Sequence, residues 1–297
     1  MSEAGLIARI RELFPRTGDD AAVVGDQVIT NDMLIEDVDF TRDVPLRLIA
    51  RKNLAVNLSD LAAMGAKPRY ALTAIGAPAW VDLRALIEEL AEAAKSYRIE
   101  IIGGDLSAAE KLTISITAIG EAKQPILRSG ARPGDRLYVS RPLGGSAAGL
   151  ELLKRGDRGA SYAQREFIEA AIKRHFDPEP EVELGMKLVG IATSCIDISD
   201  GLSSDVQHLC ENAGAEISRE RIPIFPGLLE SGLNVRDLVL NGGEELALLF
   251  TSALRESEIS AKAGRPVYMI GRITKEPGVR LDGAPLAPGG FDHFAVR

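Results

Sequence analysis

The fold is decided by the stretch Thr193-Ser-Cys-Ile-Asp197-Ile-Ser199-Asp200-Gly201-Leu-Ser-Ser-Asp205. Its first half is an apolar run that ends at two carboxylates and a glycine, and its second half has apolar positions at helical spacing. This pattern predicts a strand that delivers Asp197 and Asp200 to a site at its end, followed by a helix that continues to about Cys210.

The same arrangement occurs at four other places, where aspartates lie beside small residues at the end of an apolar segment. These places are Gly18-Asp19-Asp20, Ile29-Thr30-Asn31-Asp32, Leu58-Ser59-Asp60 and Ile101-Ile102-Gly103-Gly104-Asp105. A single aspartate is more often a helix cap or a turn residue, as we expect for Asp135 and Asp205. Five such aspartate-containing segments in one chain instead predict a site for multivalent cations, and the short oxygen ligands of aspartate suit Mg²⁺.

A chain of 297 residues is long for one hydrophobic core and sufficient for two. Turn-forming residues gather in Arg128-Ser-Gly-Ala-Arg-Pro-Gly134-Asp135, so we expect an N-terminal domain of residues 1–134 and a C-terminal domain of residues 135–297 that pack tightly. Helices are predicted over residues 6–14, 46–64, 81–97, 150–155, 163–174 and 182–189. Strands are predicted over residues 21–24, 28–31, 70–77, 99–102, 112–120, 136–140, 215–218 and 246–251.

Three small polar residues share one face of the expected helix 46–64. Asn53, Asn57 and Asp60 follow one another at spacings of four and three residues. Solvent-exposed faces carry mostly Lys, Glu and Arg, whereas this face carries Asn and Asp in an otherwise apolar helix. We therefore expect it to face a functional site, with a solvated surface as the alternative.

A glycine-rich segment, Gly144-Gly145-Ser146-Ala-Ala-Gly149, follows the expected strand 136–140. It matches neither a Walker A loop nor the spacing Gly-x-Gly-x-x-Gly of a dinucleotide fold. Two interpretations remain open: its backbone N–H groups approach a phosphate at a helix N-terminus, or its glycines permit close packing of helices.

The charge balance bears on possible partners. The net charge of −8, from 35 Lys and Arg against 43 Asp and Glu, argues against nucleic acid or an anionic membrane. An anionic ligand would then need a bound metal ion to offset its repulsion by the acidic protein. No apolar run approaches the roughly 20 residues that span a bilayer, and Cys195 and Cys210 suggest no disulfide framework. These features predict a cytoplasmic protein whose two cysteines are buried and free.

The residue pattern favours phosphoryl transfer over other chemistry. The histidines, His175, His208 and His293, are widely separated, so zinc is not expected, and the sequence has no Gly-x-Ser-x-Gly elbow. Carboxylate-held metals near glycine loops suit a reaction in which catalysis is mostly positioning and charge neutralisation. A nucleotide is the expected phosphoryl donor.

Seven motifs, in matching order across nearly the whole chain, resemble the thiamine-monophosphate kinase family. They are Gly18-Asp-Asp-Ala-Ala22, Asn57-Leu-Ser-Asp-Leu-Ala-Ala-Met-Gly65, Ile102-Gly-Gly-Asp105, Arg128-Ser-Gly-Ala-x-Pro-Gly-Asp135, Ile196-Asp-Ile-Ser-Asp-Gly-Leu202, Gly242-Gly-Glu244 and Phe291-Asp-His-Phe294. The resemblance implies an aminoimidazole-ribonucleotide-synthetase-like fold, with an α/β N-terminal domain that contributes to a β-barrel shared within a homodimer, and an α+β C-terminal domain. It also implies ATP-dependent phosphorylation of thiamine monophosphate to thiamine diphosphate by Mg²⁺-assisted, direct in-line transfer.

The resemblance also assigns roles to individual residues. The implied metal ligands are Asp20, Thr30, Asn31, Asp32, Asp60, Asp105, Asp197 and Asp200. The implied nucleotide contacts are Tyr97, Gly104, Asp105, Arg128 and Ser199, and the implied substrate contacts are Asp39, Glu244 and Phe291. Among these, Asp20, Asp60, Asp105, Asp200 and Arg128 are the residues expected to be catalytic. Phe291 is expected to stack on a heteroaromatic ring, with an anchor packed into the core as the alternative.

The sequence departs from the family pattern at two places on the substrate side. Ile35-Glu-Asp-Val-Asp39-Phe40 has an acid where the family commonly has a histidine, and Glu245-Leu246-Ala247 replaces the usual Asp-Tyr-Glu. Two alternatives therefore stay open beside the kinase. One keeps the ATP site but acts on another small molecule, and the other is a nucleotide-binding module without catalysis.

Overall fold

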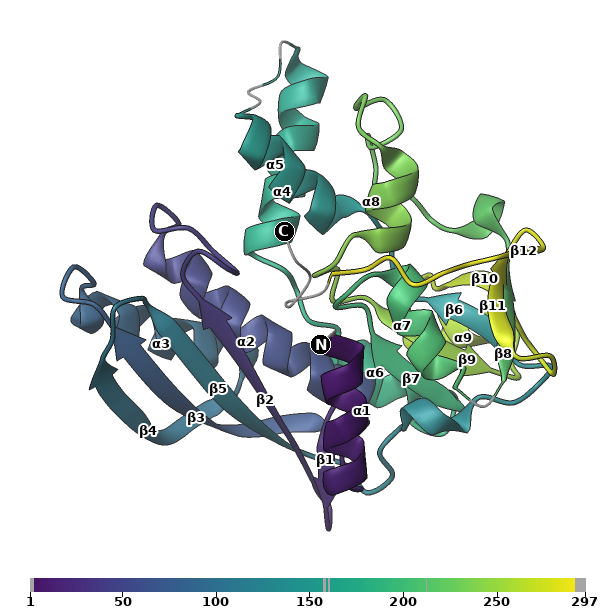
Figure 1. Ribbon diagram of the computed structural model, residues 1–297, viewed down its shortest axis with the longest axis horizontal. Coiled ribbons are helices and arrows are strands. Elements are labelled where there is room, and N and C mark those ends of the chain that lie inside the picture. The colour runs from purple at the N-terminus through teal and green to yellow at the C-terminus, as the bar shows by residue number, and fades with distance from the viewer. Residues whose placement is uncertain (1–2, 157–158, 160, 212, 292–297) are drawn as a thin grey trace.

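The computed structural model describes residues 3–156, 159, 161–211 and 213–291. They form two β-sheets, one from the N-terminal half of the chain and one from the C-terminal half, with helices packed on both (Figure 1). The expected mixed α/β architecture is therefore confirmed, and the structure builds it on two sheets. The predicted domain boundary after Gly134 lies in the connection between the sheets, and the division into domains stays a prediction.

The first sheet has five strands in the order β1-β2-β5-β3-β4, of which β3 and β4 are parallel. Its strands are β1 (Ala22–Val24), β2 (Gln27–Ile35), β3 (Lys67–Ala77), β4 (Glu100–Ala108) and β5 (Thr113–Glu121). Burial alternates along β5, so that Ile114, Ile116 and Ala118 face the core. The helices α2 (Leu46–Ala63) and α3 (Leu83–Tyr97) cover this face of the sheet (Figure 1).

The opposite face of the first sheet carries apolar side chains that the described part of the chain leaves uncovered. Met33, Tyr70, Leu72 and Ile102, from three different strands, are between 40 % and 53 % exposed. The expected buried strand 99–102 is thus wrong in its burial: it is the edge strand β4, and an apolar run predicts burial only where a second layer is present.

The second sheet has seven strands in the order β12-β11-β8-β10-β6-β9-β7. Its strands are β6 (Arg136–Val139), β7 (Ser194–Asp197), β8 (Gly214–Ile217), β9 (Leu248–Ser252), β10 (Tyr268–Thr274), β11 (Gly278–Leu281) and β12 (Ala284–Pro285). The helices of this half are α4 (Gly145–Arg155), α5 (Tyr162–Phe176), α6 (Val182–Leu188), α7 (Leu202–Leu209), α8 (Val235–Asn241) and α9 (Glu256–Ala263). The remaining helical segments are α1 (Glu3–Leu13), η1 (Arg128–Gly130) and η2 (Arg219–Arg221).

Helix α2 joins the two halves. It packs on β2 and β5 of the first sheet and also on α6 and β7 of the second half. Its residues are buried almost all round, which explains why no single apolar stripe stands out in its sequence. The approach to α6 is close, because a Cβ at Gly185 would lie 2.0 Å from the carbonyl oxygen of Ala62. One apolar cluster accordingly contains Ala62 and Ala63 together with Tyr138 and Phe250 of the second sheet.

The glycine-rich segment 144–149 begins helix α4, which starts earlier than the predicted residue 150. A Cβ at Gly149 would lie 2.2 Å from the carbonyl oxygen of Ala171 in α5, and a Cβ at Gly145 would lie 2.5 Å from the Phe225 ring. The N–H of Ser146 at the helix start donates to Glu245 Oε1 at 2.9 Å. Close packing is thus the correct interpretation. The phosphate-loop interpretation is wrong because a carboxylate of the protein already occupies this helix N-terminus.

The two aspartates expected as turn or cap residues have those roles. Asp135 Oδ2 accepts from the N–H of Arg132 at 3.1 Å, and Asp205 Oδ2 accepts from the N–H of Gly201 at 3.0 Å. Cys195 and Cys210 are buried and free, as predicted. Within the described ranges, no helix combines the length and apolar character needed to cross a bilayer.

Candidate active site

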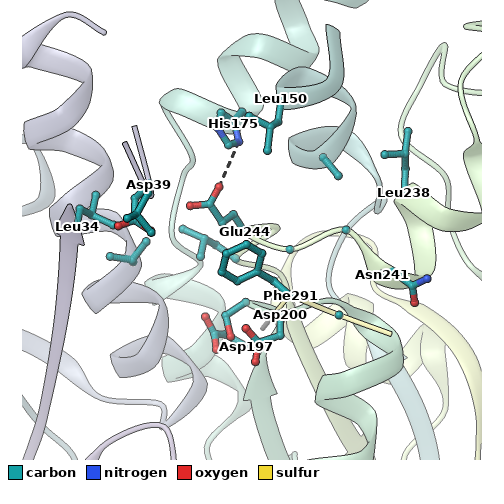
Figure 2. Close-up of a pocket in the computed structure, with 18 of the residues that line it drawn as sticks. Leu34, Asp39, Leu150, His175, Asp197, Asp200, Leu238, Asn241, Glu244 and Phe291 are labelled. Carbon is teal, nitrogen blue, oxygen red and sulfur yellow. Dashed lines mark ion pairs between the residues drawn. The ribbon is translucent and has the colours of Figure 1, made fainter. Parts of the chain in front are cut away.

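A pocket of about 590 Å³ lies between the two halves of the protein (Figure 2). One wall comes from β2, the loop after it and α2, and the other comes from α4, α5, α8 and the C-terminal tail. The ends of β7 and the turn 242–244 also line it. In Figure 2, Asp197 and Asp200 lie at one end, His175 and Leu150 lie at the other, and the ring of Phe291 lies between. The pocket is therefore acidic at one end and more apolar at the other.

Carboxylates from three separate parts of the chain meet at the acidic end. Oxygens of Asp20, Asp60 and Asp197 all lie within 4.8 Å of one another. Asp20 precedes β1, Asp60 is on the last turn of α2, and Asp197 ends β7. Asp32 and Asp200 line the pocket together with Asp60 and Asp197. Five of the six aspartates predicted as metal ligands thus come together.

Short hydrogen bonds orient these carboxylates. Thr30 Oγ1 donates to Asp60 Oδ2 at 2.5 Å, and Ser59 Oγ donates to Asp197 Oδ2 at 2.6 Å. Asp20 Oδ1 accepts from the Arg128 guanidinium at 2.6 Å. Its other oxygen, Oδ2, is buried and has no hydrogen-bond partner in the described part of the chain. A buried carboxylate oxygen without a donor is expected to bind a cation or a proton.

Burial raises the pKa of four of these carboxyls, those of Asp20, Asp32, Asp60 and Asp197, and neighbouring carboxylates add to the effect. The pKa of Asp20 is raised to about 7, and those of Asp32 and Asp197 to about 6. The pKa of Asp60 is raised well above its ordinary value, again mainly by burial. These groups cannot all be ionised near neutral pH unless a cation replaces the protons. The oxygen-only ligand set and the unpartnered Asp20 Oδ2 fit Mg²⁺.

Asn31, also predicted as a metal ligand, does not face this cluster. Side chains alternate along β2, so Asn31 lies on the opposite face of the sheet from Thr30 and Asp32. Its amide group hydrogen-bonds to Ser115 and Thr117 of β5, at 3.1 and 2.9 Å. The side chain of Asn31 thus points away from the cluster of its own protomer, and its role as a metal ligand stays a prediction.

Asp105, Gly104 and Tyr97 also lie away from the cluster within one protomer. Two strands separate β4 from β2, which at roughly 4.8 Å per strand places them about 14 Å apart. Gly104 is explained by strand packing, because a Cβ there would lie 1.8 Å from the carbonyl oxygen of Thr73. Tyr97 is at the end of α3, where its hydroxyl donates to the carbonyl oxygen of Pro178 at 3.3 Å. These three predicted contacts cannot reach the acidic end from within the same protomer.

The predicted stripe on α2 is divided between two roles. Asp60 joins the carboxylate cluster, but Asn53 and Asn57 are buried and bind the sheet. Asn53 Nδ2 donates to the carbonyl oxygen of Ile114 at 2.9 Å, and Asn57 Oδ1 accepts from the N–H of Asp32 at 3.0 Å. For Asn53 and Asn57 the prediction of a site face is wrong, because both amides satisfy backbone groups of β5 and β2.

Four other predicted contacts line the pocket: Asp39, Ser199, Glu244 and Phe291. Ser199 is exposed there, and its carbonyl oxygen accepts from the N–H of Glu244 at 2.7 Å. Asp39 lines the pocket, and its Oδ2 accepts from the N–H of Ile35 at 2.7 Å. Phe291 is 42 % exposed, and its N–H donates to the carbonyl oxygen of Asp200 at 3.1 Å. Its ring projects into the pocket (Figure 2), so the alternative of a core anchor is wrong. The rest of its motif, residues 292–294, lies outside the described residues.

Two buried residues that the sequence analysis did not place in the site hold Glu244. Lys52 Nζ lies 2.6 Å from Glu244 Oε1, and His175 Nδ1 lies 3.3 Å from Glu244 Oε2 (Figure 2 shows the second pair). Burial and, after it, the nearby Lys52 charge lower the pKa of His175 to about 4, so the imidazole is neutral at pH 7. A lysine inside an otherwise apolar helix was the one signal that could have identified Lys52.

The departure at Glu245 has a structural role. Its carboxylate is buried, accepts from the start of α4 and lies 3.6 Å from the Arg174 guanidinium. Arg174 also donates to the carbonyl oxygen of Glu245 at 2.7 Å. This glutamate supports the turn that presents Glu244 and does not itself line the pocket.

The N-terminal part of the chain is similar to the AIR synthase related proteins: residues 18–122 match the family model described as AIR synthase related protein, N-terminal domain. A thiamine-monophosphate kinase of Haemophilus influenzae is 35% identical over 304 residues, covering 93% of this chain and 90% of that protein. One from Halobacterium salinarum is 33% identical over 300 residues, covering 99% of this chain and 100% of that protein. The chain therefore belongs to the thiamine-monophosphate kinase family.

A solved structure agrees with this assignment. AaThiL complexed with AMPPCP and TMP is similar with a TM-score of 0.90 and 32% sequence identity, over 99% of this chain and 97% of that chain. The expected family is confirmed.

The raised carboxyl pKa values predict how the stability of the metal-free protein depends on pH. A carboxyl whose pKa is higher in the folded protein stabilises it fully below the unfolded value of 3.8, and this contribution is lost as pH rises through the folded value of about 7 for Asp20. Mg²⁺ relieves the loss, so it should raise Tm more at about pH 8 than at about pH 5. Thermal melts with and without Mg²⁺ measure this, and equal shifts at both pH values would contradict it. Asp60→Asn should reduce the difference, whereas Asp26→Asn, on an exposed turn, should leave it unchanged.

Proposed function

We propose that this chain catalyses the ATP-dependent phosphorylation of thiamine monophosphate to thiamine diphosphate, with Mg²⁺. The observation that carries the proposal is the convergence of five aspartates at one end of a pocket that Asp39, Glu244 and Phe291 also line. Relatives that span nearly the whole chain are named thiamine-monophosphate kinases, and AaThiL is complexed with AMPPCP, an ATP analogue, and TMP.

The acidic end suits transfer between two phosphates. A phosphate monoester has a second pKa of about 6 and is largely a dianion at pH 7, so its oxygen needs no strong general base to attack. Asp20, Asp32, Asp60, Asp197 and Asp200, with the Thr30 hydroxyl, would hold Mg²⁺. When bound, Mg²⁺ neutralises charge on the phosphate oxygens, whose mutual repulsion amounts to several kcal/mol at an effective dielectric of about 20.

Arg128 and Ser199 are the proposed nucleotide contacts within the same protomer. Arg128 donates to Asp20 at the edge of the cluster, so its guanidinium orients that carboxylate and places a positive charge beside the site of phosphoryl transfer. Ser199 is exposed between Asp197 and Asp200, where its hydroxyl can reach a phosphate oxygen. Direct in-line transfer is part of this proposal.

The opposite end of the pocket is the proposed substrate site. Phe291 offers an exposed ring for stacking on a heteroaromatic group, and apolar side chains such as Leu150 and Leu238 line the same pocket. Thiamine monophosphate carries a positive thiazolium ring, and Asp39 provides a carboxylate in the loop after β2 that can pair with it.

A homodimer is also proposed. The uncovered apolar face of the first sheet and its open edge β4 would be covered by the same face of a second copy, which would close the two sheets into a shared barrel. Tyr97, Gly104 and Asp105 would then contribute to nucleotide and metal binding through the partner subunit. A cytoplasmic location is also part of the proposal, since the two cysteines are free. So is the division into two domains between residues 134 and 135, since one sheet is built on either side of that boundary.

The first prediction concerns turnover. The purified protein with ATP, Mg²⁺ and thiamine monophosphate should form thiamine diphosphate, and Asp60→Asn should lower kcat by about a hundredfold or more because it removes a ligand charge from the cluster. Chromatographic separation of the products measures this, with Asp26→Asn as the exposed control. Undiminished turnover in excess chelator would contradict the role of Mg²⁺. ATP consumption with a different acceptor would favour the alternative substrate, and ATP binding without turnover would favour the non-catalytic module.

The second prediction concerns Asp39. Asp39→Asn keeps the acceptor for the N–H of Ile35 but removes the negative charge, so KM for thiamine monophosphate should rise by the equivalent of about 1 to 2 kcal/mol if the carboxylate pairs with the cationic ring. Steady-state kinetics at saturating ATP provide the measurement. A lowered KM would mean that Asp39 faces the phosphate, and an unchanged KM would remove it from the site.

The third prediction concerns the dimer. Ile102→Glu places a charge on the uncovered sheet face, so it should convert a dimer into monomers and lower activity by removing the partner's contribution. Light scattering at micromolar concentration shows the mass, and Leu229→Glu, on an exposed loop of the second half, is the matched control. A wild-type protein that is monomeric at this concentration would refute the shared barrel.

A further inference from the structure

The ammonium group of Lys52 has no part in the reaction as described so far, although it lies close to the pocket. Lys52 is on α2 and is only 2 % exposed. Its Nζ lies 2.6 Å from Glu244 Oε1 and donates to the carbonyl oxygen of Asp39 at 3.4 Å. Lys52 does not belong to the described residues that line the pocket, whereas Asp39 and Glu244 both do. One buried cation thus contacts the carboxylate of Glu244 and the backbone of Asp39.

The surroundings of Glu244 show that its carboxylate is held from several sides. Its backbone has a positive φ of 58°, which is uncommon for a residue with a side chain, and its N–H donates to Ser199 as described above. Leu246 N–H donates to the carbonyl oxygen of Ile198 at 3.0 Å, which fixes the other side of the turn. Lys52 approaches one carboxylate oxygen and His175 the other. The turn fixes the backbone position of Glu244, and the Lys52 and His175 side chains fix the orientation of its carboxylate.

Helix α2 connects this contact with the acidic end. Near its C-terminus, Ser59 donates to Asp197, and Asp60 joins the carboxylate cluster. From Lys52 to Asp60 the helix rises roughly 12 Å at 1.5 Å per residue. The same rigid helix therefore orients one carboxylate of the C-terminal half at each end of the pocket: Asp197 at the acidic end and Glu244 at the substrate end.

We propose that Lys52 is a positioning residue for the substrate end of the site, which acts through the Glu244 carboxylate without touching the substrate. The inference rests on the proposed kinase function. The ammonium compensates the charge of Glu244, so that Glu244 serves as an oriented acceptor for a hydrogen-bond donor of the substrate. Asp39 then provides the negative charge that pairs with the cationic thiazolium ring.

Two effects of removing Lys52 oppose each other, so the sign of the change is informative. Loss of orientation weakens the acceptor and raises KM for thiamine monophosphate. Loss of a positive charge removes a repulsion from the cationic ring and lowers KM. A positioning role requires that the first effect dominates.

The kinetic test compares the wild type with Lys52→Met, Glu244→Gln and the double variant. Lys52→Met should raise KM for thiamine monophosphate about tenfold. KM for ATP should stay within about twofold of the wild-type value, because the proposed nucleotide site lies at the other end of α2. The double variant should match Glu244→Gln, since Lys52 acts through Glu244. Lys187→Met, an exposed lysine that donates to the carbonyl oxygen of Ala263, should leave both KM values unchanged. An unchanged or lowered KM in Lys52→Met, or additive effects in the double variant, would overturn the proposal.

A second readout does not depend on activity. The Lys52 charge helps to hold the imidazole of His175 neutral, so NMR titration of His175 should show its pKa rising in Lys52→Met. His175→Asn identifies the signal among the three histidines. If Lys52→Met does not fold, Lys52→Gln replaces it, with a smaller rise in KM expected and an unchanged KM again overturning the proposal. A wild type without turnover would refute the kinase itself, whereas an unshifted His175 would refute the contact on which the inference rests.

Discussion

Mutual repulsion among buried carboxylates is the constraint on which this structure depends. Asp20, Asp60 and Asp197 come from a turn, a helix and a strand, and their oxygens lie within 4.8 Å of one another. Burial raises their pKa values, so the arrangement is costly unless cations or protons are present. Hydroxyl donors from Thr30 and Ser59 relieve part of the repulsion, and a divalent cation is the means that would relieve the rest while leaving a functional site.

Helix α2 is the element that brings this site together. It is buried between the two halves and contacts β2 and β5 on one side and β7 and α6 on the other. Five of its polar residues together contact both halves: Asn53 and Asn57 bind the strands, Ser59 and Asp60 reach the carboxylate cluster, and Lys52 reaches Glu244. Because a helix is rigid over this length, the spacing between the two ends of the pocket follows from the spacing of residues along α2.

Several predictions from the sequence could not specify the position of a residue in the fold, for different physical reasons. Asn31 was assigned with its neighbours although side chains on a strand alternate between faces, and the motif does not say which face the helices cover. The glycines at 144–149 fit both a phosphate loop and close helix packing, and the decision came from Glu245, about 100 residues later in the chain, which caps the helix. Asp105, Gly104 and Tyr97 carry the family pattern, yet their distance from the cluster depends on the strand order.

The sequence by itself determined three things, because each depends on short-range patterns. The aspartate-containing segments follow from an aspartate after an apolar run, and most helices and strands follow from the period of apolar residues. The family follows from motifs in matching order. Only the tertiary structure decided which of these segments meet. Strand order places β4 at the far edge, the packing of α2 brings Asp60 to Asp20 and Asp197, and the turn at Glu244 meets a lysine nearly 200 residues earlier in the chain. Contacts between residues so distant in sequence form through the packing of whole elements, and no local pattern of residues encodes that packing.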